Sequence, residues 1–277
     1  MKVTAVDLDS LDNINMPEVT YKYRTWKSGD SHNDNVLLSN QLFMAYPNGF
    51  EDKFDCKIPT SYNLLTDDEK LEWCEKILRR TFVKYSEEAI KREAQHYFKL
   101  DRFNDKAWMK RFEADEWELY NMKAGVLSMC LNPFNEDMWN KYAMKHTGIC
   151  YGFNTKNLIR AIGASGWGNV DYCKELPPIH PNDDVMVQAT IRAFHKLEKW
   201  SFEEEYRIRT FHESNADINN RIITYPNSAL EFVILGKNFN ENETQALIDI
   251  LTMKEATARL YQCVDSNGTL SVQIINY

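Results

Sequence analysis

Hydrophobic and polar positions follow different periods in different parts of the chain. Near the start, the stretch Tyr21-Lys22-Tyr23-Arg24 alternates, a polar segment follows at 29–35, and a short apolar run occupies 42–46. Alternation over a few residues, broken by polar segments, is typical of short strands joined by loops. Residues 19–56 are therefore predicted to be strand-like and rich in loops, with 29–35 as a polar loop.

The pattern changes to helical spacing between residues 66 and 122. Thr66 is followed three positions later by Glu69, which is the pattern of a capping box at a helix start. Two further helical stretches are expected at about 86–100 and 105–123. Each short helix has one apolar stripe and buries too little surface to fold alone. We therefore expect a helical insertion at 64–123 within a single domain that spans 1–277.

Strands and helices alternate irregularly after Gly125. Strands are expected at 126–131, 149–153, 204–211, 230–235, 259–263 and 270–275, and helices at 135–145, 155–162, 185–200 and 241–251. Irregular alternation favours an α+β fold over a regular βαβ winding. The prediction is a mixed or antiparallel β core, with the inserted all-helical block covering one side.

Composition and charge describe an ordinary globular chain. Its 277 residues are 43% hydrophobic and 27% charged, with a net charge of −8, so intrinsic disorder and strong non-specific nucleic-acid binding are not expected. No apolar run is long enough to span a membrane, and the first residues carry acids without an apolar signal segment. The expectation is a cytoplasmic protein without membrane contact.

Cysteines and glycines indicate no metal or phosphate site. The six cysteines contain no C-x-x-C pair, so reduced thiols are expected and no metal is predicted. The only glycine cluster, at 163–168, follows a predicted helix, whereas a phosphate loop follows a strand. It is interpreted as a helix end and a turn.

Two segments could carry chemistry. If residues 203–209 form a strand, Glu203, Glu205, Arg207 and Arg209 share one face. In a cleft, such a charged ladder could bind a hydroxylated or phosphorylated ligand, but on a solvated edge strand it would only pair charges.

The second segment is the predicted helix at 135–145. Trp139 and Tyr142 share a helix face, and His146 follows one turn later. These rings could stack a planar ligand, or they could belong to the core.

The motifs together resemble the bacterial DUF2971 family, whose function is unknown, from about residue 21 to 251. The matching pieces are Tyr-Lys-Tyr-Arg at 21–24, Met-Trp…Tyr-Ala…His with Gly-Phe at 138–153, and Glu-x-Glu-Tyr-Arg at 203–207. The sequence departs from the family pattern at Lys141, where a histidine is usual, and at Phe202, where a tyrosine is usual. The resemblance implies a fold and almost no function.

A weaker, fold-level analogy links the order of these pieces to ADP-ribosyltransferases. The analogy implies that Glu205 or Glu203 stabilises the oxocarbenium-like centre formed when the glycosidic bond of NAD breaks. It also implies that Arg24 pairs with the pyrophosphate and that Trp139 or Tyr142 stacks on nicotinamide, with Tyr23, His146 and Arg207 as further binding residues.

The sequence therefore leaves two candidate functions. The first is an NAD-consuming transferase or glycohydrolase, as in a bacterial toxin or phage-defence effector, whose macromolecular acceptor is unidentified. The second is a non-enzymatic interaction module, antitoxin-like or sensor-like, whose partner protein is unidentified. Nuclease chemistry would need a metal held by the turn acids Glu51, Asp52 and Asp55. The first function predicts that Tyr23 or Arg24, Trp139, His146 and Glu205 converge on one cleft.

Overall fold

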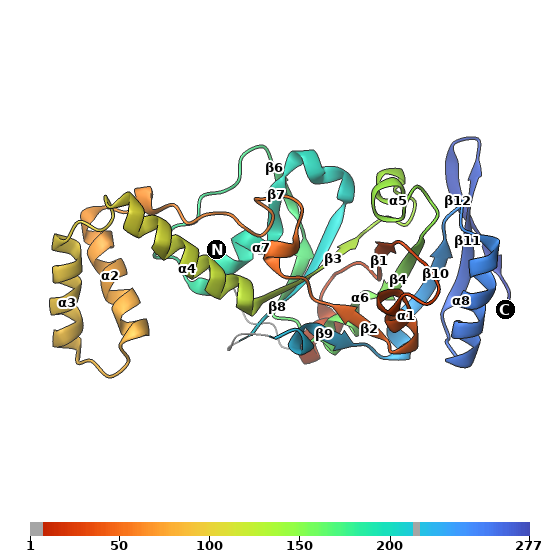
Figure 1. The fold of residues 1–277 in the computed structure, drawn as a ribbon, viewed down its shortest axis with the longest axis horizontal. Coiled ribbons are helices and arrows are strands. Elements are labelled where there is room, and N and C mark those ends of the chain that lie inside the picture. The colour runs from red at the N-terminus through yellow and green to blue at the C-terminus, as the bar shows by residue number, and fades with distance from the viewer. Residues whose placement is uncertain (1–7, 213–216) are drawn as a thin grey trace.

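An eight-stranded mixed sheet forms the centre of the computed structural model, which describes residues 8–212 and 217–277 (Figure 1). The strand order is β12-β11-β10-β4-β1-β3-β8-β5, and all neighbours are antiparallel except β10 and β11. The α+β class with a mixed sheet is confirmed. The strands are β1 (Val19–Arg24), β3 (Ala124–Cys130), β4 (Ile149–Asn154), β5 (Gly166–Asn169), β8 (Glu205–Phe211), β10 (Leu230–Leu235), β11 (Arg259–Ser266) and β12 (Thr269–Ile275).

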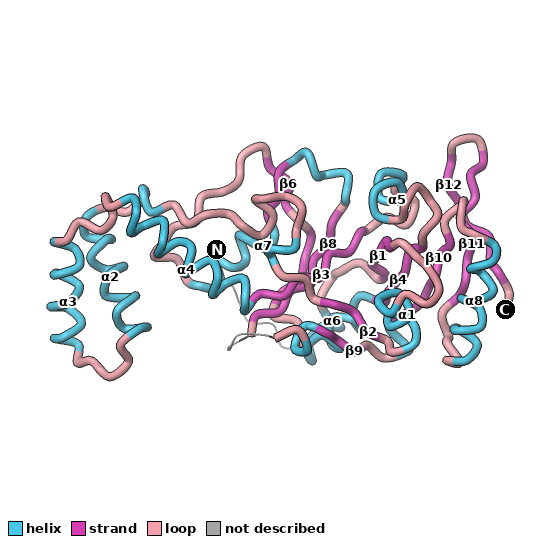
Figure 2. Tube along the Cα trace, viewed as in Figure 1, coloured by secondary structure: helices cyan, strands magenta, loops and turns pink. Residues whose placement is uncertain are grey.

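Helices and two small strand pairs surround this sheet (Figure 2). The described helices are α1 (Ser31–Leu38), α2 (Asp67–Thr81), α3 (Glu87–Lys99), α4 (Lys106–Lys123), α5 (Glu136–Tyr142), α6 (Thr155–Ile162), α7 (Val185–Phe194) and α8 (Glu241–Met253). The small pairs join β2 (Gln41–Phe43) to β9 (Ile222–Thr224), and β6 (Asp171–Cys173) to β7 (His195–Leu197). Within the described ranges, none of the helices combines the length and apolar character that crossing a bilayer requires.

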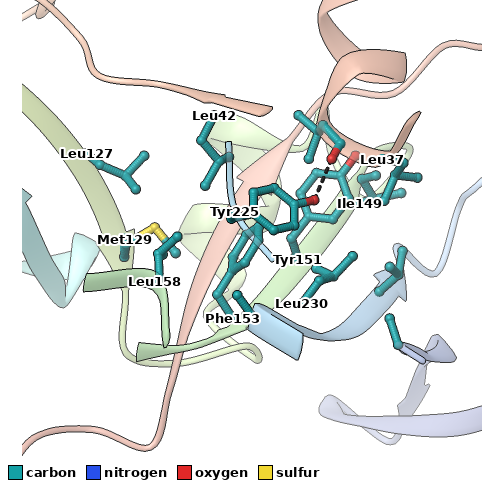
Figure 3. Packing of buried hydrophobic residues seen from close by; sticks show 14 of the residues in the cluster. Leu37, Leu42, Leu127, Met129, Ile149, Tyr151, Phe153, Leu158, Tyr225 and Leu230 are labelled. Atoms are coloured by element: carbon teal, nitrogen blue, oxygen red, sulfur yellow. Dashed lines mark hydrogen bonds between the residues drawn. The ribbon is translucent and has the colours of Figure 1, made fainter. Parts of the chain in front are cut away.

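The largest apolar cluster lies on one face of the sheet, between the strands and helices α1 and α6 (Figure 3). Tyr225 lies within it, with its ring edge-on to Phe153, and donates a hydrogen bond to the carbonyl of Val36. A second cluster, which includes Trp139 of α5, covers alternate residues of the same strands, such as Cys150 beside Tyr151. Because strand side chains alternate between faces, the sheet is buried on both sides here.

The helical block α2–α4 projects from one end of the molecule (Figure 1). The capping box at Thr66 and Glu69 is present at the start of α2. The block has its own apolar cluster, in which the Trp73 ring packs edge-on against Phe103 and Phe112. Figure 1 shows α2 and α3 beyond the end of the sheet, and neither helix contributes to the sheet's apolar clusters. The expectation that the block covers one side of the sheet is therefore wrong for these two helices, whereas α4 leads directly into β3.

Some local predictions differ from the structure. Residues 29–35, expected to be a loop, include the first half of α1, because Val36 and Leu37 at its end are buried in the main cluster. The helix expected at 185–200 ends at Phe194 and is followed by β7 and a 3₁₀ helix, Glu198–Glu203. Gly163 ends α6 with a φ of 62°, as the helix-end interpretation of the glycine cluster requires.

Candidate functional site

A cleft of about 450 Å³ opens where β1 and β3 separate. The two strands pair at a single position, Tyr21 opposite Cys130, and further along β3 it is Ala45 that pairs with Val126. Residues 21–25 line one wall of the cleft, and residues from β3 line the other. The site therefore depends on a break in strand pairing, which gives side chains of β1 access to the interior of the sheet.

A buried cluster of charged side chains forms the deep side of this cleft. Arg207 donates from Nε to Oε1 of Glu205 at 2.6 Å and from Nη2 to Oδ1 of Asp55 at 2.7 Å. Lys196 of β7 lies 3.1 Å from Asp55 Oδ2 and 3.2 Å from Glu205 Oε2, and it also contacts Glu203. We call these five residues the ion cluster. All five are less than 6% exposed, so their mutual contacts replace water.

Charge pairing shifts the pKa values of Glu205, Lys196 and Arg207 within the ion cluster. Burial by itself would raise the pKa of Glu205, but the positive charges of Arg207 and Lys196 outweigh burial and lower the pKa to about 2. The same acids hold the pKa values of Lys196 and Arg207 above their ordinary values, although burial opposes this. The cluster thus contains three acids and two cations next to the cleft.

The charged ladder expected at 203–209 exists only in part. β8 lies between β3 and β5, so the solvated edge-strand interpretation is wrong: Arg207 is 0% exposed. Glu203 ends the 3₁₀ helix, and Glu204 has a φ of 42°, which interrupts the strand alternation. Glu203 still meets Glu205 because both contact Lys196. Arg209 donates instead to Thr190 of α7, away from the cluster.

The structure brings some of the predicted site residues into one cleft and buries others. Those that line the cleft are Tyr23, Arg24, Tyr142, Glu203 and Glu205. Arg207 lies behind Glu205 in the ion cluster. Arg24 and Glu205 both line this cleft, whereas Trp139 and His146, which the convergence hypothesis also placed there, do not line it.

Trp139 and His146 are core residues, which corrects their expected place in the cleft. Their rings stack with centroids 5.1 Å apart and 12° between planes, and both are at most 1% exposed. Trp139 donates to the carbonyl of Pro133, and Nε2 of His146 lies 3.0 Å from Glu136. The physical reason is that α5 buries this face against β1, with Tyr23 edge-on to Trp139.

Two cations of β1 lack a counter-charge in the described part of the chain. Arg24 has a buried Nε with no hydrogen-bond partner there, and burial lowers its pKa. Lys22, two positions earlier, donates to the carbonyl of Ser128 at 2.6 Å. Burying an unpaired cation costs free energy. An anionic group of a ligand at this wall would therefore be stabilised by pairing with these cations.

Lys196 and Lys22 were not predicted as site residues. Lys196 was assigned to a helix, and its approach to Asp55 depends on the β6–β7 pair. Lys22 belongs to the Tyr-Lys-Tyr-Arg motif, in which only Tyr23 and Arg24 were predicted to bind a ligand. A lysine inside an alternating apolar stretch is the one signal that could have marked Lys22.

The turn acids considered for a metal have other partners. Asp52 accepts a hydrogen bond from Nε1 of Trp200 at 2.7 Å, Asp55 belongs to the ion cluster, and Glu51 lies 3.1 Å from Lys141. Among the residues that the structure describes, no group of three or more His, Cys, Asp or Glu side chains is arranged to hold a metal ion.

Comparison with known proteins matches one part of the chain. Residues 138–208 match a family model described as "Protein of unknown function (DUF2971)", and this segment contains Tyr142, Lys196, Glu203, Glu205 and Arg207. The search of curated proteins and the search of solved structures each found no match. The resemblance to DUF2971 is therefore confirmed over the segment that runs from α5 to β8 and supplies the deep side of the cleft.

Proposed function

We propose that the protein is an enzyme that breaks the glycosidic bond of NAD in the cleft between β1 and β3. The observation that carries the proposal is the ionised Glu205, with a pKa lowered to about 2, in the same cleft as Arg24, which has no ion pair among the described residues. An ADP-ribosyl group would pass to water or to a macromolecular acceptor. Such NAD consumption would be the chemical basis of a toxin or phage-defence effector.

Each charged wall of the cleft has a part in this reaction. When the bond from C1′ of the ribose to nicotinamide breaks, its electron pair leaves with nicotinamide and positive charge develops on the ribose. Glu205 and Glu203 stabilise this charge, because ionised carboxylates in a partly dry site interact strongly with it. Arg24 pairs with the pyrophosphate, and the cleft-lining rings of Tyr142 and Trp200 offer apolar surface to nicotinamide.

The size and chemistry of the cleft support a ligand of this class. Pockets for small molecules and cofactors usually measure about 300–1,000 Å³, and this cleft measures about 450 Å³. The buried, unpartnered Nε of Arg24 is a donor available to a phosphate oxygen. Cations on one wall and carboxylates on the other would orient a molecule with an anionic end and an electrophilic sugar.

The experiment measures NAD consumption by the wild type and three variants. Arg24→Met is the sharpest variant, because Arg24 has no ion pair among the described residues and its loss should not lower thermal stability. We expect its NAD turnover to fall about 10- to 100-fold, the worth of one charge-assisted contact. Glu205→Gln should lose about 100-fold. Arg111→Met, at an exposed position of α4, is the matched control and should behave like the wild type.

Two results would overturn the proposal. One is a folded wild type that consumes no NAD, either alone or with a bacterial lysate as the source of acceptors. The other is normal turnover by Arg24→Met.

The alternative, an interaction module, is favoured by a different observation. Every carboxylate oxygen of Glu203 and Glu205 already has a donor: Tyr142 and Lys196 for Glu203, and Arg207 and Lys196 for Glu205. A second cleft, of about 550 Å³, lies between the helical block and α7. Its lining holds six cations and only two acids, namely Lys57, Lys76, Arg80, Lys110, Lys123 and Arg192 against Glu113 and Glu116. This surface fits an acidic segment of a partner protein.

The two functions differ in what Lys110→Glu would do. If the protein is an interaction module, this reversal of charge should abolish pull-down of a partner. Neither the wild type nor the variant should then consume NAD. If the enzyme is correct, Lys110→Glu should keep wild-type NAD turnover in the absence of an acceptor.

A further inference from the structure

We propose that Lys22 is the general base of the cleft, which takes the proton from the acceptor hydroxyl or water as that oxygen attacks C1′ of the ribose. This inference rests on the proposed function and adds to it a residue and a role. Lys22 lies in the middle of β1 and lines the cleft. Its Nζ donates to the backbone carbonyl of Ser128, 2.6 Å away across the gap between β1 and β3.

Within the described ranges, Lys22 has no negatively charged partner of its own. The acids whose charges act on Lys22 are Glu205 and Glu203, whose oxygens accept from Arg207, Lys196 and Tyr142. Among the ion pairs of the described residues, none includes Lys22. An amine held in this way is stabilised in its neutral form, since a buried unpaired charge is unfavourable.

Charges from several elements act on this amine. Arg24 faces it from the same strand, Glu205 from β8 and Glu203 from the 3₁₀ helix. The other titratable groups that line the cleft are Tyr21, Tyr23, Glu51, Asp52, Asp55, Cys130, Tyr142 and Lys196. Burial is the largest influence and Arg24 the next, and together they lower the pKa of Lys22 to about 7 against the opposing effect of the two glutamates. Most of the amine is therefore neutral at slightly alkaline pH.

A neutral amine in this position is suited to accept a proton. One N–H points to the Ser128 carbonyl, which orients the group and leaves its lone pair available to a second partner. Glu205, with a pKa of about 2, is a weak base at neutral pH and is suited to stabilise charge instead. A base works best when its pKa lies near the working pH, so the two tasks fall to different residues.

The proton balance of the step is complete. The acceptor oxygen forms its bond to C1′ as the C1′–nicotinamide bond breaks, and the acceptor O–H proton moves to Nζ of Lys22. The resulting ammonium group lies near Glu203 and Glu205, whose negative charge favours it. It then loses the proton to solvent through the open side of the cleft.

The first experiment measures the protonation of Lys22 directly. Lysines are dimethylated with ¹³C-formaldehyde, which forms an imine with loss of water, and cyanoborohydride reduces the imine; the methyl signals are then followed by NMR from pH 5 to 11. The Lys22 signal, assigned by its absence in Lys22→Arg, should titrate near pH 7. Lys199, whose side chain is 60% exposed, serves as the exposed-lysine reference for the methyl signals. A Lys22 midpoint above about 9, or a Lys22 that the reagent cannot reach, would overturn the proposal.

The second experiment tests the role in the reaction. Lys22→Arg keeps a positive charge but cannot act as a base near neutral pH, so NAD turnover should fall at least about 100-fold. The rise in rate between pH 6 and 8 expected for the wild type should disappear, and added methylamine should partly restore the rate of Lys22→Ala. Lys199→Arg is the matched control.

The outcomes separate the two proposals. An unchanged pH profile in Lys22→Arg would remove Lys22 from the reaction while leaving NAD cleavage in place. Absence of NAD turnover in the wild type would overturn the proposed function, and with it the role in that reaction. The NMR titration would still decide whether Lys22 is a neutral amine.

Discussion

Lys22 should make the stability of the protein depend on pH in an unusual direction. Its pKa in the folded state is about 7, below the 10.5 of an ordinary lysine. Below pH 7 the folded state holds an unpaired ammonium group, which lowers the free energy of unfolding. Between pH 7 and 10.5 the unfolded chain binds more protons than the folded chain, so stability rises with pH over this interval. The effect of this residue is thus a gain in stability with rising pH.

Replacing Lys22 by Met should stabilise the protein most at low pH. We expect the free energy of unfolding to rise by about 2 kcal/mol at pH 6, less than the full shift implies because the side chain is partly exposed. At pH 10 the gain should be small. Thermal melts of the wild type, Lys22→Met and Lys199→Met at both pH values make the comparison. Equal effects of Lys22→Met at pH 6 and pH 10 would contradict the prediction.

At the scale of elements, the helical block and the sheet have separate apolar clusters. Trp73 is the centre of the block's cluster, in contact with the rings of Tyr62, Phe103 and Phe112. The sheet's clusters draw no residue from α2 or α3. Local unfolding of α2 and α3 would therefore leave the apolar clusters of the sheet intact.

Trp73→Ala should loosen the block and leave the sheet intact. Removing a buried indole costs about 3–5 kcal/mol, so amides of α2 and α3 should exchange their hydrogens much faster. Amides of β3, β4 and β10 should keep their protection. Val83→Ala is the control, because Val83 is 82% exposed. Equal loss of protection in the sheet would show that block and sheet unfold together.

That the block cannot fold on its own remains a prediction. A fragment of residues 62–123 should show only partial helix content by circular dichroism and no cooperative melting transition, since its three helices share one small cluster. Cooperative melting of the fragment would contradict it.

At the scale of the whole molecule, the ion cluster links segments far apart in the chain. Asp55 and Arg207 are separated by 152 positions, and Lys196 comes from a different strand pair. The cluster therefore forms only when β7, β8 and the loop before Ile58 are all in place. Its protonation should affect the stability of the whole fold.

The protein should lose stability between pH 4.5 and 2 through Glu205. Its pKa is about 2 when folded, against an ordinary 4.5, so its contribution is fully present above pH 4.5 and is lost as the pH falls through that window. The size of this contribution is about 3 kcal/mol. Urea unfolding at pH 7 and pH 3 should show a smaller pH dependence in Glu205→Gln than in the wild type. Glu118→Gln, at an exposed site, should leave the dependence unchanged, and an equally steep loss in Glu205→Gln would contradict the assignment.

Local patterns in the sequence were enough for most elements. The Thr66–Glu69 capping box, the helix end at Gly163, and the strands that became β1, β4 and β10 were all predicted, because caps, turns and periodicity act within a few residues. The α+β class followed from the order of these elements. The short strands β5, β6 and β9 were missed, since each depends on a partner elsewhere in the chain.

The candidate site followed partly from the sequence and partly from the tertiary structure. Arg24 and Glu205 were predicted to share a cleft, and they do, because the motif strands that carry them lie on either side of β3. Only the tertiary structure decided that β8 is interior, that Trp139 and His146 belong to the core, and that Lys196 joins the acids. The reason is physical: periodicity specifies which residues share a face, whereas strand order and the gap between β1 and β3 determine which faces are buried and which meet.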